Sequence, residues 1–433
     1  MPPRHPSSFC SLRKTILFLA TTSSSRHAGI GTPFVATSAF ITSSSSFVAS
    51  SRRKMAVLKT SMQRSVACLS LSDLNVNQTD RQFFPPPKFR GLFAGSGSGC
   101  LSDATFAKEI LQLLPPSSPS RRRSEDGGPN VLYLGTATYD LPAPRARQTD
   151  RLKELGCTIN SLDVSIRSPS QSDIRTAIES ADIILVGGGN TLYAVDRWTR
   201  LGMIPLLREA SERGAVLAGG SAGAIWVFDG GHSDSADPDT FRRAMLDAAA
   251  AGINAKKGMS QCEEEHEDES SAAPASGKET KDWKYVRVPG LGFLPGLCCP
   301  HGDMVQSNGV PRSDDFDEML LRHDGERGIC IDHWAALLIK GGEYRIVCCE
   351  NRPGSVVIDR GTSETKFCPD RTGKPGVWIK ECVNGVIEQS LCPPEGKVSD
   401  ILRFPTKIVD NLDELEKCRR ANPDVAHNTL QEF

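Results

Sequence analysis

Residues 215–228 read AVLAGGSAGAIWVF, in which an apolar run is followed by small residues around Ser221 and then by a second apolar run. The run at 215–218 predicts a buried strand, and the residues after the serine are compatible with a helix. Gly219 to Gly223 fit the G-x-S-x-G pattern, in which a serine occupies a sharp strand-to-helix turn that bulky neighbours would block. In this context Ser221 is a candidate nucleophile. The alternative is an ordinary tight bend.

Upstream of this turn, strand and helix patterns alternate along the chain. The strand patterns span residues 91–95, 131–134, 158–164, 182–186 and 215–218, and the helix patterns span 103–114, 145–155, 171–180, 192–199 and 204–213. Such alternation predicts an α/β fold, a three-layer sandwich in which helices cover both faces of a mostly parallel sheet. We expect this domain to occupy residues 83–340.

Downstream of the turn the pattern changes twice. Small and acidic residues dominate about 249–281, with the run CEEEHEDESS, and a like-charged block predicts a solvated, disordered insertion. Residues 328–340 then predict two short strands around a turn at Asp332 and His333. From 341 to 433, short strand-like pieces separated by Pro and Gly predict a small β-rich C-terminal extension.

The N-terminal segment differs in composition from the rest of the chain. Residues 1–72 contain no Asp or Glu, while Ser, Arg and Lys recur. This composition predicts that residues 1–82 are a disordered organellar transit peptide, directed to a plastid or a mitochondrion. The alternatives are an uncleaved disordered tail, or translation that starts at Met55 and leaves the protein in the cytoplasm.

Overall composition narrows the classes of partner. The chain has 433 residues, a net charge of −1 and 39% hydrophobic residues, so we expect no nucleic-acid partner. It has no uninterrupted apolar run of about 18 residues, so no membrane partner is expected either. The 14 cysteines are scattered and form no C-x-x-C pair. We therefore expect reduced thiols, no metal site and no organic cofactor.

A glycine run follows the strand that precedes the serine strand. Gly187, Gly188 and Gly189 come directly after the apolar run DIILV. Because loops at the carboxyl ends of parallel strands converge on one crevice, this run is well placed to supply a second donor to an oxyanion beside Ser221. The alternative is a phosphate cradle, although the run lacks both the P-loop lysine and the G-x-G-x-x-G spacing.

A serine nucleophile needs a base and a group that orients the base. Among the histidines, His301 in CCPHGD stands on a loop fixed by Gly and Pro, and it is the preferred base. His333 is the reserve. The orienting acid is expected to be Asp234 or Asp237, with Asp303 as a more distant candidate.

These motifs, taken in order, carry a resemblance. DIILVGGGNT, AVLAGGSAGAIWVF, GHSDS and a PH dipeptide, within roughly residues 90–340, resemble the peptidase E (aspartyl dipeptidase) family of serine peptidases, to which cyanophycinase is also similar. The resemblance implies a fold like that of class I glutamine amidotransferases and a Ser-His-Asp/Glu triad. The acidic insertion and the β-rich extension are departures from the compact bacterial dipeptidases.

The resemblance also implies roles for single residues. It makes Ser221 the nucleophile, His301 the base and Asp234 the acid. It forms the oxyanion hole from the N–H groups of Gly188 or Gly189 and of Ala222, and it lets Asn190 and Arg312 hold a substrate carboxylate.

The implied activity is hydrolysis of small peptides, dipeptides with an N-terminal Asp above all, through an acyl-enzyme. The alternatives are a cyanophycinase-like or isopeptide hydrolase on the same triad, and a catalytically silent binding module. The expected partner is a small peptide substrate, and a homodimer is left open.

Overall fold

The computed structural model describes residues 85–116, 128–165, 167–256, 280–349, 352, 354, 356–358, 365–367 and 374–424. These residues belong to one compact unit, 71–433. The transit peptide predicted over 1–82 and residues 257–279 of the predicted insertion lie outside the described residues.

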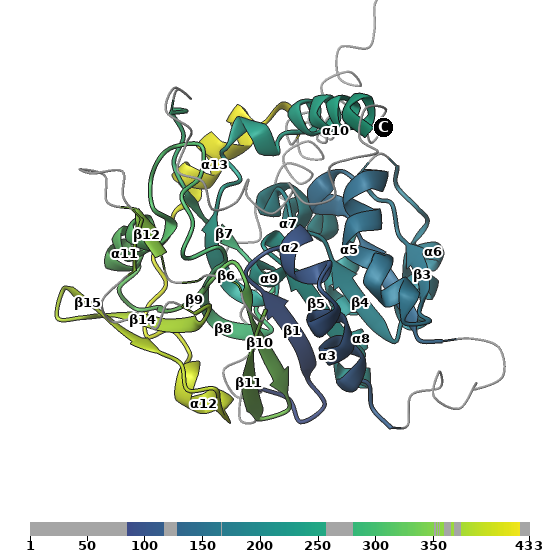
Figure 1. The fold of residues 1–433 in the computed structure, drawn as a ribbon, viewed down its shortest axis with the longest axis horizontal. Coiled ribbons are helices and arrows are strands. Elements are labelled where there is room, and N and C mark those ends of the chain that lie inside the picture. The colour runs from purple at the N-terminus through teal and green to yellow at the C-terminus, as the bar shows by residue number, and fades with distance from the viewer. Residues whose placement is uncertain are drawn as a thin grey trace, which may run out of the picture. The chain divides into compact units, whose positions relative to one another are not determined.

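The larger of two main sheets has eight strands. In spatial order they are β16 (Glu395–Lys397), β11 (Glu343–Cys348), β10 (Ala335–Lys340), β1 (Arg90–Ala94), β5 (Val216–Gly220), β4 (Ile183–Val186), β2 (Asn130–Leu134) and β3 (Thr158–Ser161). From β1 through β5, β4 and β2 to β3, each strand is parallel to its neighbour. On the other side of β1, the neighbouring pairs β1–β10, β10–β11 and β11–β16 are antiparallel (Figure 1). The predicted α/β fold with a mostly parallel sheet is confirmed.

Helices cover both faces of this sheet. Because successive strand residues point to opposite faces, each buried strand contributes to two cores. Ile184 and Val186 pack with residues of α6, α7 and α8, whereas Ile183 and Leu185 pack with residues of α2, α3 and α5. The helices are α2 (Ser98–Leu101), α3 (Ala104–Gln112), α5 (Pro142–Glu154), α6 (Gln171–Glu179), α7 (Thr191–Arg200), α8 (Met203–Arg213), α9 (Ala222–Ile225), α10 (Arg242–Lys256), α11 (Arg312–Arg322), α12 (Val398–Ile401) and α13 (Leu412–Ala421), with 3-10 turns η2 (Thr136–Thr138) and η3 (Pro238–Thr240).

A second sheet has six strands. In spatial order they are β15 (Val386–Leu391), β14 (Val377–Val383), β9 (Arg327–Ile331), β8 (Leu294–Cys299), β6 (Phe228–Ser233) and β7 (Val286–Pro289). Within it β6, β8 and β9 are parallel, and the other pairs are antiparallel. The strands β12 (Val356–Ile358) and β13 (Thr365–Phe367) form a two-stranded antiparallel sheet.

The C-terminal residues are β-rich, as predicted, but most of their strands complete the two main sheets. β11 and β16 extend the first sheet, while β14 and β15 extend the second. A further difference concerns residues 249–256, which composition assigned to the insertion and which form the end of α10. Four consecutive alanines, 248–251, explain this difference because alanine has the highest helix propensity.

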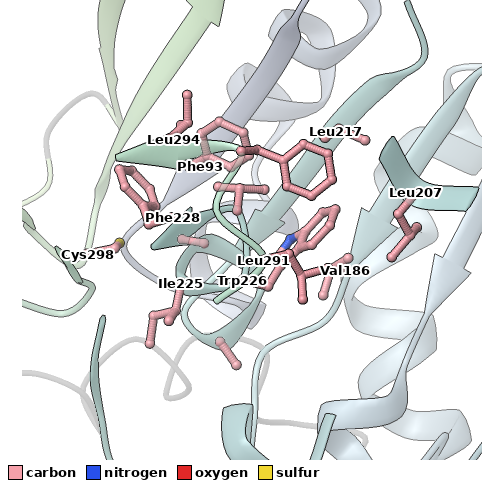
Figure 2. Packing of buried hydrophobic residues seen from close by; sticks show 14 of the residues in the cluster. Phe93, Val186, Leu207, Leu217, Ile225, Trp226, Phe228, Leu291, Leu294 and Cys298 are labelled. Atoms are coloured by element: carbon pink, nitrogen blue, oxygen red, sulfur yellow. The ribbon is translucent and has the colours of Figure 1, made fainter. Parts of the chain in front are cut away.

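A hydrophobic core joins the first sheet to the second. Figure 2 shows Phe93 of β1, Trp226 after α9 and Phe228 of β6 gathered in this core. The rings of Phe93 and Phe228 meet edge to face, with centroids 6.2 Å apart. Trp226 and Phe228 are fully buried, so the residues that follow the serine turn are held in this core.

Candidate active site

Ser221 lies on a strained turn between β5 and α9. Its backbone has φ 58° and ψ −119°, a combination that residues other than glycine rarely adopt. The Ser221 N–H donates to the Ala94 carbonyl at 3.1 Å, and the residue is partly exposed. Such strain persists only where the surroundings enforce it, and it is characteristic of functional sites. The turn has the strand-to-helix setting of a nucleophile elbow.

Close backbone approaches explain the small residues around the serine. A Cβ atom at Gly219 would lie 2.1 Å from the Gly223 carbonyl oxygen, and one at Gly223 would lie 2.1 Å from the Val186 oxygen. A Cβ atom at Gly220 would lie 2.0 Å from the Ser96 oxygen. The G-x-S-x-G pattern is therefore required by packing of the turn against the loops after β1 and β4.

Three glycine-rich loops meet at the carboxyl ends of β1, β5 and β4, which are neighbours in the sheet. A Cβ atom at Gly188 would lie 3.3 Å from the Ser221 Cβ, and one at Gly97 would lie 3.2 Å from the Gly188 Cα. The loop after β4 thus lies close beside the serine. This is the arrangement expected when loops follow adjacent parallel strands.

The backbone N–H groups beside Ser221 are available to a ligand. Within the described part of the chain, no hydrogen-bond acceptor contacts the N–H groups of Gly188, Gly189 or Ala222, whereas that of Gly187 donates to Leu134 at 3.1 Å. Ala222 is the first residue of α9, where N–H groups have no partner within the helix. These are the donors that an oxyanion hole needs.

His301 follows β8 and lies at the end of β1. Its backbone N–H donates to the Gly95 carbonyl at 3.2 Å, one residue beyond the carbonyl that binds the Ser221 N–H. His301 also has a positive φ, 53°. Its ring Nδ1 lies 2.7 Å from Nδ1 of His333, in the turn between β9 and β10. The backbone N–H groups of the predicted serine and histidine therefore bind consecutive carbonyl groups at the end of β1.

The His301 ring has one nitrogen left for catalysis. Nδ1 is bound to His333, and among the described residues neither Ser221 nor any other group forms a hydrogen bond with Nε2. Burial, the neighbouring His333 and the positive Arg312 each lower the pKa of His301 well below its usual value. The ring is therefore neutral at physiological pH, the state in which it can accept a proton.

Asp234 and Asp237, the two acids predicted first, have other hydrogen-bond partners. Asp234 Oδ2 accepts hydrogen bonds from Arg312 Nη1 at 3.3 Å and from Gln306 Nε2 at 3.0 Å. Asp237 Oδ2 accepts one from Ser307 Oγ at 2.9 Å. The structure brings neither acid to the ring of the preferred base in the residues it describes.

Arg312, predicted to hold a substrate carboxylate, is the first residue of α11 and is fully buried. Besides its ion pair with Asp234, it donates through Nη2 to the His232 carbonyl at 2.8 Å. Its guanidinium carbon lies 5.1 Å from the centre of the Tyr285 ring. The charge of Arg312 is thus already balanced inside the protein.

Asn190, the other predicted carboxylate ligand, is the N-cap of α7. Its Oδ1 accepts from the Tyr193 N–H at 3.0 Å. Its amide donates to the Ser235 carbonyl at 3.0 Å and to Thr240 Oγ1 at 2.8 Å. The side chain therefore holds the glycine loop against the chain that follows β6.

The His333 contact is the feature of the site that the sequence motifs do not reveal. The sequence predicts that His333 lies in a turn and favours it only as the reserve base. The pairing joins residues separated by 32 positions. Among the residues described, no cluster of three or more His, Cys, Asp or Glu side chains could hold a metal ion, and no helix is long and apolar enough to cross a membrane.

A serine on a strained strand-to-helix turn, beside N–H groups that have no acceptor among the described residues, has the geometry that serine hydrolases use. Sequence comparison shows which proteins the chain is similar to. The pattern of peptidase family S51 matches residues 109–251. The uncharacterized peptidase YgaJ of Bacillus subtilis strain 168 is 37% identical over 117 residues, which cover 27% of this chain and 50% of that protein. Peptidase E of Escherichia coli O6:K15:H31 is 36% identical over 122 residues, covering 27% and 53%.

Two further similarities cover more of the chain but have lower sequence identity. A Trypanosoma brucei brucei protein named G2/mitotic-specific cyclin-1 is 28% identical over 328 residues, covering 73% of this chain and 88% of that protein. A crystal structure of a putative peptidase E protein from Listeria monocytogenes EGD-e has a TM-score of 0.38 and 16% identity, and the match covers 60% of this chain and 99% of that one.

Over residues 109–251 the chain is therefore similar to peptidase family S51, and over 117 to 122 residues it is similar to bacterial peptidase E-like proteins. The matched region spans about half the length of the bacterial peptidases named above, 50% and 53%.

Proposed function

We propose that this chain hydrolyses short peptides, dipeptides with an N-terminal acidic residue among them, with Ser221 as nucleophile and His301 as general base. The observation that carries the proposal is the strained Ser221 turn, which lies close to Gly188 and beside N–H groups that have no acceptor among the described residues. The family match supports the same reaction class.

The reaction follows from these positions. His301 Nε2 accepts the Ser221 hydroxyl proton as Oγ bonds to the peptide carbonyl carbon, and the carbonyl electrons move to its oxygen. The N–H groups of Gly188 and Ala222 stabilise that oxyanion. As the C–N bond breaks, His301 gives its proton to the leaving amine. Water then attacks the acyl-enzyme by the same route, which breaks the ester bond to Ser221 and releases the carboxylic acid product.

Substrate preference depends on Arg312. Its guanidinium is buried and paired with Asp234, so a substrate carboxylate would have to compete with an internal one. We therefore propose that acidic dipeptides are cleaved with only a modest advantage over neutral dipeptides of similar size. A free guanidinium in the same place would give a larger preference.

A dipeptide panel tests the function. Residues 83–433 would be assayed on Asp-X, Glu-X, neutral and β-aspartyl dipeptides, and labelled with an alkyl fluorophosphonate that reacts with activated serines. Ser221→Ala should lower kcat/KM on the order of 10⁴-fold or more and abolish labelling. Activity that survives this substitution would contradict the assignment. A wild-type protein that neither cleaves nor reacts would indicate a silent binding module.

Asp234→Asn separates two roles for this carboxylate. If Asp234 only balances Arg312, neutral dipeptides should be cleaved within about tenfold of wild type. Acidic dipeptides should gain, because a paired charge has been removed from the guanidinium. If Asp234 oriented His301, all substrates would lose about 10⁴-fold in kcat. Arg312→Met is the companion variant, and it should reduce the acidic preference if substrates reach Arg312.

A further inference from the structure

The contact between His301 and His333 joins two segments that the backbone already holds together. Besides the 2.7 Å contact between the two Nδ1 atoms, the Gly302 N–H donates to the Ile331 carbonyl at 2.9 Å, and Asp303 Oδ1 accepts from the His333 N–H at 2.7 Å. These two hydrogen bonds hold the segment of His301 against the segment of His333.

The turn that carries His333 is itself enclosed. Asp332 exchanges hydrogen bonds with the backbone of Gly376, donating its N–H at 3.0 Å and accepting at Oδ2 at 2.8 Å. A Cβ atom at Gly95 would lie 1.9 Å from the Asp332 carbonyl oxygen, so the turn rests directly on the end of β1. The His333 ring is 4.7 Å from the Trp334 ring, and the residue is 9% exposed.

A contact between two Nδ1 atoms imposes a proton arrangement. A hydrogen bond between two neutral imidazoles needs one Nδ1 to carry the proton and the other to accept it. If His301 Nδ1 carries it, His301 Nε2 has the free lone pair that a general base for Ser221 requires, and His333 is the Nε2–H tautomer. The opposite arrangement would leave a proton on His301 Nε2 and block proton transfer from the serine.

We propose that His333 is the positioning residue of this site: its Nδ1 accepts the His301 Nδ1–H, and this hydrogen bond fixes the orientation and tautomer of the base in place of a carboxylate. The proposal rests on the proposed serine peptidase function. Within the described residues no carboxylate forms a hydrogen bond with the His301 ring, and His333 occupies the nitrogen that a triad acid would bind.

A neutral partner has a chemical consequence. A carboxylate stabilises the imidazolium that forms when the base takes the serine proton, whereas a neutral imidazole offers an acceptor without a negative charge. Replacing His333 with an acidic residue should therefore raise the pKa of His301, and replacing it with a neutral acceptor should not.

The first test observes the protons directly and needs no substrate. Imidazole nitrogens with and without a proton differ widely in ¹⁵N chemical shift, so the histidine-labelled full chain reports each tautomer, with assignments from His301→Gln and His333→Leu. At pH 7.5 we expect His301 to carry its proton at Nδ1 and His333 at Nε2. In His333→Leu, the His301 proton should move largely to Nε2. A His301 Nε2–H tautomer in the wild type, or an unchanged tautomer in His333→Leu, would overturn the proposal.

The second test measures nucleophile activation in a matched series. His333→Leu removes the acceptor, His333→Asn keeps a neutral acceptor near the Nδ1 position, and His333→Asp supplies a charged one. Fluorophosphonate labelling of Ser221 should slow on the order of 10²- to 10⁴-fold in the Leu variant and stay within about tenfold of wild type in the Asn variant. The acid limb of the labelling rate should move to higher pH in the Asp variant.

These outcomes separate the inference from the function it rests on. Equal slowing by Leu and Asn, with each variant showing wild-type thermal unfolding, would contradict a positioning role for the acceptor. A wild type that shows the expected tautomers but is not labelled would contradict the peptidase function and leave the His301–His333 hydrogen bond established.

Discussion

Among single residues, Gly188 has little space for a larger side chain. A Cβ atom there would lie 3.3 Å both from the Ser221 Cβ and from the Gly220 carbonyl oxygen. We expect Gly188→Ala to displace the N–H donor beside the serine and to lower kcat on the order of 10² to 10³-fold, the usual cost of losing one oxyanion donor. KM and thermal unfolding should change little. Gly342→Ala is the control, because a Cβ atom at Gly342 meets nothing within 4 Å.

In the proposed reaction, the protonation of His301 sets the pH range of activity. Burial first, then His333 and Arg312, lower the pKa of His301, and burial and Arg352 lower the pKa of His333 to about 4. Because the base must be unprotonated to act, a lowered pKa keeps it active in more acidic solution. We expect the acid limb of kcat/KM to lie below the ordinary histidine value of about 6.5. A limb at or above that value in the wild type would contradict a buried, neutral base.

The residues of the site differ in how far the sequence could predict them. Ser221 and the glycine loop were predictable, because strand, turn and small residues are adjacent in the chain. The partners of His301 and Asp234 were not, since these contacts join residues 32 and 78 positions apart. A nearby acid in the sequence, such as Asp234, is a weak guide when an arginine from another element balances it first.

At the scale of elements, a buried ion pair joins β7 to the start of β9. Arg287 donates to Glu326 through Nε at 2.8 Å and Nη2 at 2.7 Å, and both side chains are fully buried. Removing one partner leaves an uncompensated buried charge, so Arg287→Met should lower the free energy of unfolding by about 3–5 kcal/mol. Urea unfolding measures this change.

Two companion variants make the ion-pair measurement specific. The double variant Arg287→Met with Glu326→Leu should recover much of the loss, because it removes the stranded charge. Arg243→Met breaks a solvent-exposed pair with Asp247 and should change the free energy of unfolding by less than about 1 kcal/mol. An Arg287→Met protein as stable as this control would show that the buried pair contributes little.

Elements with strong local signals were the most predictable ones. The strand and helix patterns between 91 and 218 correspond to the strands β1 through β5 and to helices between them. Each pattern depends on spacing within a few residues. The pairing of the C-terminal strands depends instead on distant partners, such as Val377 opposite Ile331. Short strands separated by Pro and Gly do not reveal which sheet they join, so the sequence predicted only a small β-rich extension.

At the scale of the whole molecule, the C-terminal strands connect the fold to the site. β14 lies beside β9, and Gly376, just before β14, holds the Asp332 side chain next to His333. The C-terminal segment also supplies core residues, with Val377, Trp378 and Val398 almost completely buried. The stability of the fold and the proposed orientation of His301 therefore depend on the same segment.

A truncation tests this dependence. Compared with residues 83–433, the fragment 83–340 loses several buried side chains worth about 1.5–3 kcal/mol each, a sum comparable to the net stability of a typical domain, about 5–15 kcal/mol. We expect the fragment to lose cooperative thermal unfolding and fluorophosphonate labelling of Ser221. Ser221→Ala in 83–433 provides the folded, unlabelled control. A fragment 83–340 that melts cooperatively and is labelled at the rate of 83–433 would show instead that these residues form an autonomous peptidase domain.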